Sequence, residues 1–167
     1  MDLVVLTTTT PQETLKALIV DADPSFYTVA AKAPGATHCV LWYRFSLHRN
    51  CEINIIVSNA MAIPSVPSHH IELVEGLPVM PLAGVLLLKL QAWQNHRDAA
   101  QECVNLKQHV DAADIQQMLR VALARRVRPA KEDWLPEMAL TAGRKRVALF
   151  VVSYADTSPG WRKLGML

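Results

Sequence analysis

Polar residues on two apolar, strand-like segments are the first candidates for chemistry. Asp2 opens the apolar segment 2–7, and the segment 51–57 carries Glu52 and Asn54 between apolar neighbours. Because side chains alternate along a strand, Glu52 and Asn54 are expected on one face of a sheet. Carboxylate oxygens suit Mg²⁺ and Mn²⁺, which neutralise charge in phosphoryl transfer. We therefore take Asp2, Glu52 and Asn54 as candidate catalytic residues, with Asp2 and Glu52 as candidate metal ligands.

Both groups also have a simpler interpretation. Asp2 could be a first-residue aspartate on a frayed chain end. Glu52 and Asn54 could form the solvent-facing stripe of an edge strand, which is common in sheets with one wet face. The sequence alone leaves these alternatives open.

Lys89 is the third candidate, because it interrupts the apolar run Leu86-Leu-Leu-Lys-Leu90. At helical spacing it falls on one stripe with Trp93 and His96. Such a lysine must extend to the surface, pair with an acid, or face a polar cleft where it can hold a phosphate. A structural role and a binding role both remain open for it.

Two aspartates and the histidines have simple structural explanations. Asp111 is expected to cap a helix and Asp114 to lie in its first turn, where negative charge favours the helix dipole. They become site residues only if the fold brings them to Lys89. The pair His69-His70 and His96 are expected to be exposed, and Cys51 to be a small buried residue.

Length and composition limit the class of protein. The 167 residues are 51% apolar and 19% charged, as in a globular domain. The three cysteines are an odd number, which excludes a complete set of internal disulfides and favours a reducing, cytoplasmic location. No apolar run reaches the roughly 20 residues of a membrane span. A net charge of +2 does not indicate nucleic-acid binding by itself, so that partner stays open.

The residue patterns predict an α+β fold, with strands first and helices after them. Thr10-Pro-Gln-Glu13 has the form of a capping box and predicts a helix over about 11–20. We expect a single domain in which a small mixed sheet within 1–75 packs against a helical part, 81–167. Strands are predicted over 2–7, 26–31, 37–46, 51–57 and 69–74, with 37–46 and 51–57 as a hairpin, an irregular loop over 58–68, and helices from Pro81, Asp111, Gly143 and Ser158.

Four segments together resemble a known family. They are Asp2-Leu-Val-Val-Leu, Cys51-Glu-Ile-Asn-Ile-Ile-Val57, Leu86-Leu-Leu-Lys-Leu-Gln-Ala-Trp93 with Arg97, and Lys107-Gln-His-Val-Asp-Ala-Ala-Asp-Ile115. Their order and spacing, from Asp2 to Leu123, are similar to those of nucleotidyltransferase-fold proteins of the polymerase-beta-like superfamily. The likeness is to proteins related to the AbiEii toxin, and especially to uncharacterised fungal members.

The resemblance implies a role for each matching residue. Asp2 would be the second acid of a metal-binding pair, and Asn54 would stand where a third acid belongs. Lys89 would contact a nucleotide phosphate, with Asp111 or Asp114 orienting it and Arg97 as a weaker match. The implied cofactor is Mg²⁺ or Mn²⁺, and the implied ligand is a nucleoside triphosphate.

The departures from the family pattern predict a truncated or degenerate protein of this fold. The Gly-Ser element and first aspartate that normally precede Asp2 are absent, and Asn54 lacks a charge. Whether the chain is an enzyme is therefore open, and we expect weak nucleotide binding at most. The alternatives are a non-catalytic, homodimeric interaction module, and a longer natural chain in which Met1 is an internal methionine.

Overall fold

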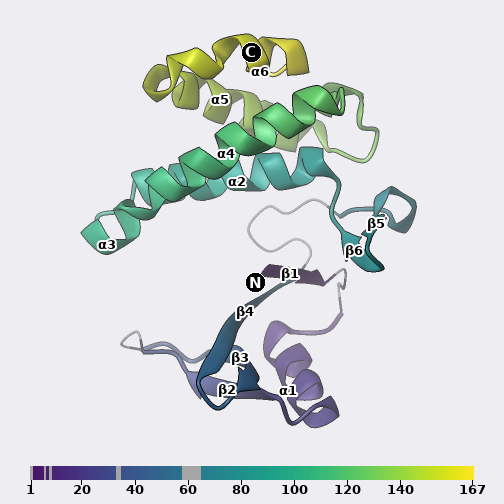
Figure 1. Ribbon diagram of the computed structural model, residues 1–167, viewed down its shortest axis with the longest axis vertical. Coiled ribbons are helices and arrows are strands. Elements are labelled where there is room, and N and C mark those ends of the chain that lie inside the picture. Colours follow the sequence, from purple (N-terminus) through teal and green to yellow (C-terminus); the bar gives the residue numbers. More distant parts are fainter. Residues whose placement is uncertain (1, 6, 8, 33–34, 58–64) are drawn as a thin grey trace. The chain divides into compact units, whose positions relative to one another are not determined.

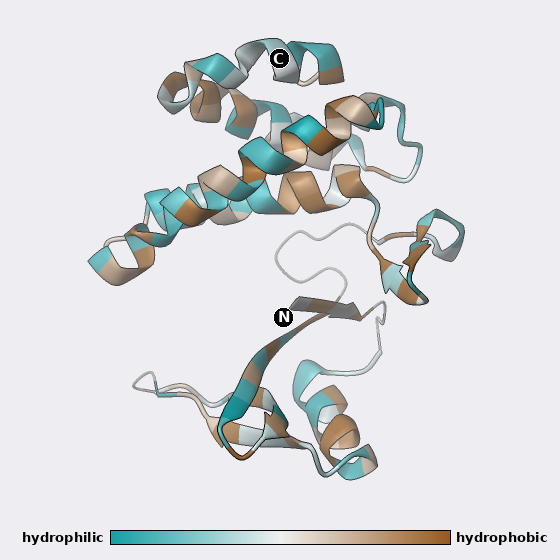
Figure 2. Ribbon diagram, viewed as in Figure 1, coloured by the Kyte–Doolittle hydropathy of each residue, from teal (hydrophilic) through white to brown (hydrophobic). Residues whose placement is uncertain are grey.

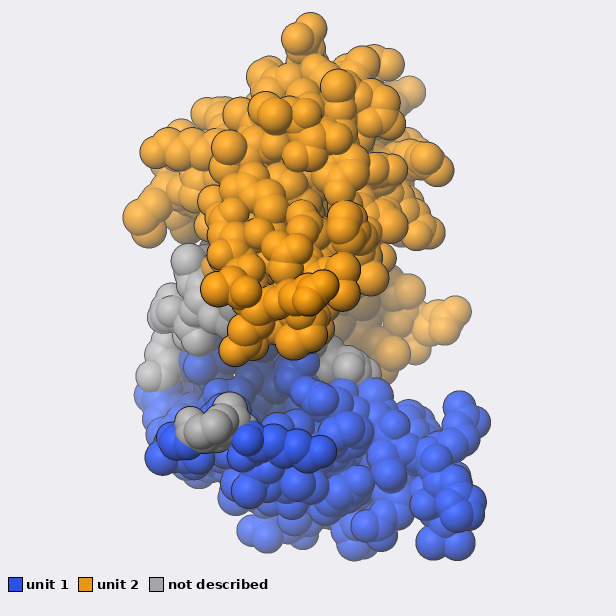
Figure 3. All heavy atoms as spheres, turned by 90° about the vertical axis from the view of Figure 1, so that its left-hand side faces the viewer, with its two compact units in different colours: residues 1–65 blue, residues 66–167 orange. Residues whose placement is uncertain are grey.

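A computed structural model describes residues 2–5, 7, 9–32, 35–57 and 65–167. The chain divides into two compact units, residues 1–65 and 66–167, which Figure 3 shows in different colours. Each unit is described here by itself. The single domain, and the packing of the sheet against the helices, therefore stay predictions, and most of the loop expected over 58–68 lies outside the described residues.

The first unit contains a mixed four-stranded sheet (Figure 1). Its strands are β1 (Asp2–Val5), β2 (Phe26–Ala30), β3 (Cys39–Ser46) and β4 (Arg49–Val57), in the order β1-β4-β3-β2. β1 runs parallel to β4, whereas the β2–β3 and β3–β4 pairs are antiparallel. The predicted mixed sheet and the β3–β4 hairpin are confirmed.

One face of this sheet is covered by helix α1 (Gln12–Ala22). Leu41, Ile53 and Ile55 are fully buried there, with side chains of α1 packed against them. Glu52 and Asn54 alternate with these residues and are exposed. The predicted division of β4 into a polar and an apolar face is therefore confirmed.

The predicted capping box at the start of α1 does not form. The helix cap is Pro11, which has no side-chain cap bond, and Thr10 donates its backbone N–H to Thr7 Oγ1 instead. The carboxylate of Glu13 accepts hydrogen bonds from the Lys16 ammonium and the Cys39 backbone N–H. The capping box does not form because Glu13, which would have to bind the Thr10 backbone N–H, is bound to Lys16 and to β3 instead.

The second unit is mainly helical. A short hairpin precedes the helices, and the strand predicted over 69–74 is only partly correct, because residues 68–70 form a 3₁₀ turn. The elements are β5 (Glu72–Val74), β6 (Leu77–Val79), α2 (Leu82–Arg97), α3 (Glu102–Asn105), α4 (Lys107–Ala124), α5 (Glu137–Ser153) and α6 (Ser158–Leu164), with further 3₁₀ turns at Pro129–Lys131 and Ala155–Thr157. None of the helices among the described residues is long and apolar enough to cross a bilayer.

An aromatic cluster lies at the centre of the helical core. The ring of Phe150 lies 5.0 Å from that of Trp93, 4.6 Å from that of Tyr154 and 6.3 Å from that of Trp161, centroid to centroid. Apolar residues alternate with hydrophilic ones along α2 and α4 (Figure 2), as expected for helices buried on one side. The predicted buried stripe of α4 is confirmed, with Ile115 and Leu119 in the core.

Gly143 lies inside α5 and does not precede it. A Cβ atom at this position would lie 2.5 Å from Leu87 Cδ2, so the glycine permits a close approach of α5 to α2. The predicted helix start after Gly143 is wrong, because this packing outweighs the weak helix propensity of glycine. The last predicted turn, at Ser158, is confirmed as α6.

Candidate functional site

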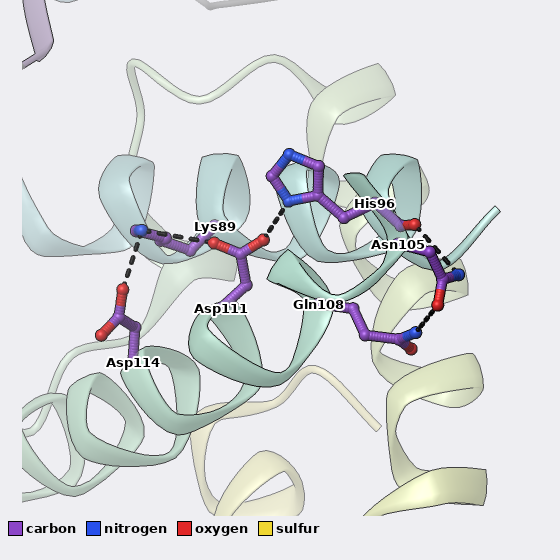
Figure 4. Close-up of polar contacts among 6 residues, drawn as sticks. All are labelled: Lys89, His96, Asn105, Gln108, Asp111 and Asp114. Carbon is purple, nitrogen blue, oxygen red and sulfur yellow. Dashed lines mark hydrogen bonds and ion pairs between the residues drawn. The ribbon is translucent and has the colours of Figure 1, made fainter. Parts of the chain in front are cut away.

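The ammonium of Lys89 lies between two carboxylates of the neighbouring helix (Figure 4). Its Nζ atom is 2.9 Å from Asp114 Oδ2 and 3.5 Å from Asp111 Oδ1. Lys89 comes from α2 and the two aspartates from α4, and these helices pack side by side. The structure thus brings together three of the predicted site residues, which sequence spacing alone could not place in contact.

The three groups differ in their access to water. The Asp111 side chain is 8% exposed, whereas those of Lys89 and Asp114 are 33% and 43% exposed. Burial lowers the pKa of Lys89, but the hydrogen bond and charge of Asp114, together with Asp111, outweigh it and raise the pKa above its ordinary value. Lys89 is therefore a cation at neutral pH.

His96 belongs to the same cluster. Its Nδ1 atom lies 2.5 Å from Asp111 Oδ2, so the carboxylate of Asp111 joins His96 to Lys89. The Asn105 amide donates to the backbone carbonyl of His96, and Gln108 donates to Asn105 Oδ1 (Figure 4). The same amide also donates to the backbone carbonyl of Arg97. These bonds tie the end of α2 to α3 and to the first turn of α4. We name Lys89, His96, Asp111 and Asp114 the α2–α4 cluster.

Two expectations about this cluster are wrong. Asp111 is not a helix cap, because α4 begins at Lys107 and Asp111 lies in its second turn. The predicted dipole roles of Asp111 and Asp114 therefore do not apply. His96 is not a freely exposed histidine, since its side chain is 27% exposed and bound to Asp111. Its place on one stripe with Lys89 was the sequence signal that could have revealed this.

Arg97 has different partners. Its Nε atom donates to Asp98 Oδ1 over 2.8 Å, and its guanidinium lies 4.8 Å from the ring centre of Trp93. These contacts describe a cation stacked on an aromatic side chain at the end of α2. A nucleotide-binding role for Arg97 stays a prediction.

The acidic candidates of the first unit lie on adjacent strands. Asp2 of β1 is the register partner of Asn54 of β4, and Glu52 lies two residues before Asn54 on the same exposed face. Oxygen donors of this kind suit Mg²⁺ or Mn²⁺. However, the described residues contain no group of three or more His, Cys, Asp or Glu side chains arranged to hold a metal. The metal site therefore stays a prediction.

A hollow of ≈ 420 Å³ lies beside Glu52 and Asn54. The pairing of β3 with β4 ends at Leu41 and Ile53. Beyond that pair, side chains of α1 bind the backbone carbonyls of the two strands. Gln12 Nε2 donates to Ile55 O, and Lys16 Nζ donates to Cys39 O, each over 2.5 Å. The hollow is lined by Gln12, Lys16, His38, Cys39, Val40, Leu41, Glu52, Ile53, Asn54 and Ile55.

Lys16 is a buried lysine with specific polar partners, and sequence reasoning did not single it out. It is 4% exposed, and its ammonium lies 2.6 Å from Glu13 Oε1. The hydrogen bond from Lys16 lowers the pKa of Glu13, so the two form an ion pair at neutral pH. The position of Lys16 beside the apolar residue Leu15 offered only a weak sequence signal.

Comparison with known proteins does not settle the family. No protein-family model matches the chain, and no curated protein is significantly similar to it. The resemblance to nucleotidyltransferases therefore rests on the four segments and their order along the sequence.

Proposed function

We propose that this chain is a degenerate nucleotidyltransferase-fold protein that binds a nucleoside triphosphate weakly and with a divalent metal ion. Lys89 contacts a phosphate, Asp111 and Asp114 orient its ammonium, and Arg97 assists. Asp2 and Glu52 serve the metal ion, with Asn54 in place of a third acid. The observation that supports the proposal most is the position of Lys89 Nζ between Asp111 and Asp114, the pair that the resemblance implies.

The chemistry of the lysine is compatible with this role. A lysine ammonium has three donors, and among the described residues Lys89 uses two of them on carboxylates. The third can donate to a phosphate oxygen. Because two carboxylates flank one ammonium, an unaccompanied triphosphate would be repelled, and a divalent cation bound to the phosphates reduces that repulsion.

An active protein of this kind would transfer a nucleotidyl group. A hydroxyl oxygen of a protein, an RNA or a small molecule would attack the α-phosphorus of the triphosphate. The bond from that phosphorus to the bridging oxygen would break, and pyrophosphate would leave as the hydroxyl proton is lost. The missing charge at Asn54 weakens metal binding. We therefore propose that the chain binds a nucleotide but transfers the nucleotidyl group poorly.

Calorimetric titration with each nucleoside triphosphate, with and without Mn²⁺, tests the proposal. We expect metal-dependent binding by the wild-type chain and no binding by Lys89→Ala. Lys145→Ala is the matched control, because Lys145 is an exposed lysine of α5 outside the α2–α4 cluster. Unchanged affinity in folded Lys89→Ala protein would refute the proposed site.

A second candidate function is a homodimeric interaction module. The β5–β6 hairpin exposes Leu73 (74%), Val74 (46%), Leu77 (67%) and Val79 (39%). A two-stranded hairpin is marginal alone, and contiguous exposed apolar residues often mark an interaction site. Sedimentation velocity over a range of concentrations tests this candidate, and a strict monomer at high concentration counts against it.

A further inference from the structure

One nitrogen of the His96 ring is bound within the α2–α4 cluster, and the other is not. Nδ1 lies 2.5 Å from Asp111 Oδ2, and the Asp111 side chain is only 8% exposed. The second nitrogen, Nε2, points away from Asp111 (Figure 4). Within the described part of the chain no polar group binds Nε2, and the His96 side chain is 27% exposed. His96 therefore offers a nitrogen that a ligand can reach.

The contact with Asp111 determines which ring nitrogen carries the proton. A carboxylate accepts hydrogen bonds and does not donate them, so Nδ1 of His96 is the N–H group. In the neutral ring, Nε2 then holds a lone pair and can take up a proton. The imidazolium that forms is stabilised by the adjacent negative charge. Asp111 thereby prepares His96 as a proton acceptor.

The surrounding backbone holds the ring in this orientation. Lys89 and His96 are two helical turns apart on α2, so both side chains lie on the face that Asp111 contacts. The His96 backbone carbonyl accepts a hydrogen bond from Asn105 Nδ2 over 3.3 Å, which ties the end of α2 to α3. A catalytic base is effective when neighbouring groups fix its geometry. These contacts fix His96 without using Nε2.

The ring also lies close to the proposed phosphate contact. Lys89 Nζ is 3.5 Å from Asp111 Oδ1, and His96 Nδ1 is 2.5 Å from the other oxygen of the same carboxylate. The ammonium and the imidazole are thus separated by the width of one carboxylate. A hydroxyl group that attacks a phosphorus beside Lys89 can come within hydrogen-bond reach of Nε2. All of these groups belong to the second compact unit, so the arrangement does not depend on where the first unit lies.

We infer that His96 is the general base of the nucleotidyl transfer. The inference rests on the proposed function and adds the residue that activates the acceptor hydroxyl. As the hydroxyl oxygen bonds to the α-phosphorus, its proton passes to Nε2. The bond from that phosphorus to the bridging oxygen breaks, and pyrophosphate leaves with the bonding electrons. The imidazolium then gives its proton to water. Asp111 is a positioning residue in this step, because it acts through His96.

The test separates proton transfer from nucleotide binding. The full chain is given each nucleoside triphosphate in Mn²⁺ with a short RNA, a serine-containing peptide or glycerol as acceptor, and pyrophosphate release is measured. His96→Asn retains an amide that can donate to Asp111 but cannot take up a proton. It should lower kcat about 100-fold or more and leave the nucleotide Kd, measured by calorimetry, unchanged. His109→Gln is the control, because His109 is an exposed histidine elsewhere on α4, and it should change neither value.

A base role also predicts chemical rescue. His96→Ala leaves a space beside Asp111, so added imidazole should restore pyrophosphate release in this variant. Imidazole should not restore release in Lys89→Ala, in which the phosphate contact itself is lost. A histidine that only stabilises the contact of α2 with α4 would give neither result, since folded His96→Asn protein would then keep its kcat.

The outcomes distinguish this inference from the proposed function. Equal kcat in wild type and folded His96→Asn would overturn the general base and leave nucleotide binding intact, as would wild-type protein that binds nucleotide but releases no pyrophosphate with any of the three acceptors. A loss of nucleotide affinity in His96→Asn would overturn the base and make His96 a binding residue. Absence of nucleotide binding by the wild-type chain would refute the proposed function itself. If His96→Ala does not fold, the comparison of His96→Asn with wild type decides alone.

Discussion

The contact of Lys89 with Asp111 should be measurable as a stability contribution in the absence of any ligand. Lys89→Met removes the ammonium and retains much of the apolar stem. It leaves the Asp111 carboxylate, 8% exposed, with only His96 among its described charge partners. A buried carboxylate that loses one of its two partners in this way is less stable, because the lost contact no longer compensates for its lost hydration.

The size of the effect follows from the exposure of the three groups. Breaking a fully buried ion pair costs about 3–5 kcal/mol. Here the Lys89 side chain is 33% exposed, so water partly compensates, and we expect a loss of about 1–2 kcal/mol for Lys89→Met. Asp114→Asn should cost less than about 0.5 kcal/mol, because Asp114 is 43% exposed and can be hydrated.

The double variant Lys89→Met/Asp111→Asn provides the decisive comparison. It removes both charges of the Lys89–Asp111 contact and leaves only the exposed Asp114 carboxylate, so its loss of stability should be smaller than the sum of the single losses by about 1 kcal/mol. Urea unfolding followed by far-UV circular dichroism reports mainly on the helices and gives the four free energies of the cycle. Additive losses would refute the coupling between Lys89 and Asp111.

The pH dependence of this cycle follows from the raised pKa of Lys89. A lysine whose pKa is raised by folding stabilises the folded state at any pH below its ordinary value of 10.5. That contribution is lost only as the pH rises through the higher pKa of the folded state. The cost of Lys89→Met should therefore be nearly constant between neutral pH and pH ~9 and decrease above pH ~10.5.

Two further predictions concern packing and the first unit. Gly143→Ala should lower the thermal unfolding temperature, because the new Cβ would lie 2.5 Å from Leu87 Cδ2. The cost of overpacking, about 1–3 kcal/mol, exceeds the gain in helix propensity of about 1 kcal/mol. A higher unfolding temperature would contradict the close approach of α5 to α2. The lowered pKa of Glu13 predicts a contribution that is present above its ordinary value of 4.5 and is lost as the pH falls through the pKa of the folded state. In urea unfolding between pH 3 and 7, the free energy of unfolding should therefore fall less steeply with acid in Glu13→Gln than in wild type. The difference should be under about 1 kcal/mol because Glu13 is 48% exposed. Identical slopes in the two proteins would show that the Glu13–Lys16 pair does not contribute to stability.

Local patterns predicted the elements that depend on short-range periodicity. The alternation of β4, the β3–β4 hairpin and the buried stripe of α4 follow from spacing alone and are confirmed. The start of α4 could not be predicted in this way, because its first turn carries no side-chain cap and continues from the helical residue Leu106. The beginning of α5 was missed for a tertiary reason, the close packing of Gly143 on Leu87.

The candidate site shows more clearly that short-range sequence patterns do not predict tertiary contacts. Residue types identified Lys89, Asp111 and Asp114 as candidates, but their contact depends on how α2 packs on α4. Lys16 and Gln12 were missed because their partners are backbone carbonyls of β3 and β4, which no sequence motif marks. Interactions of a side chain with a distant backbone group leave little trace in composition or spacing.

The parallel pairing of β1 with β4 has a consequence for the order of folding. The β3–β4 hairpin pairs strands that are adjacent in sequence and closes a short loop. By contrast, β1 pairs with residues 54–57, which are far from it in sequence. Contacts between distant residues require more chain entropy to be lost before they gain any energy. The hairpin should therefore form early, with β1 joining its edge last. In unfolding the order reverses, so the backbone amides of β1 should exchange with solvent through openings that leave β2, β3 and β4 paired.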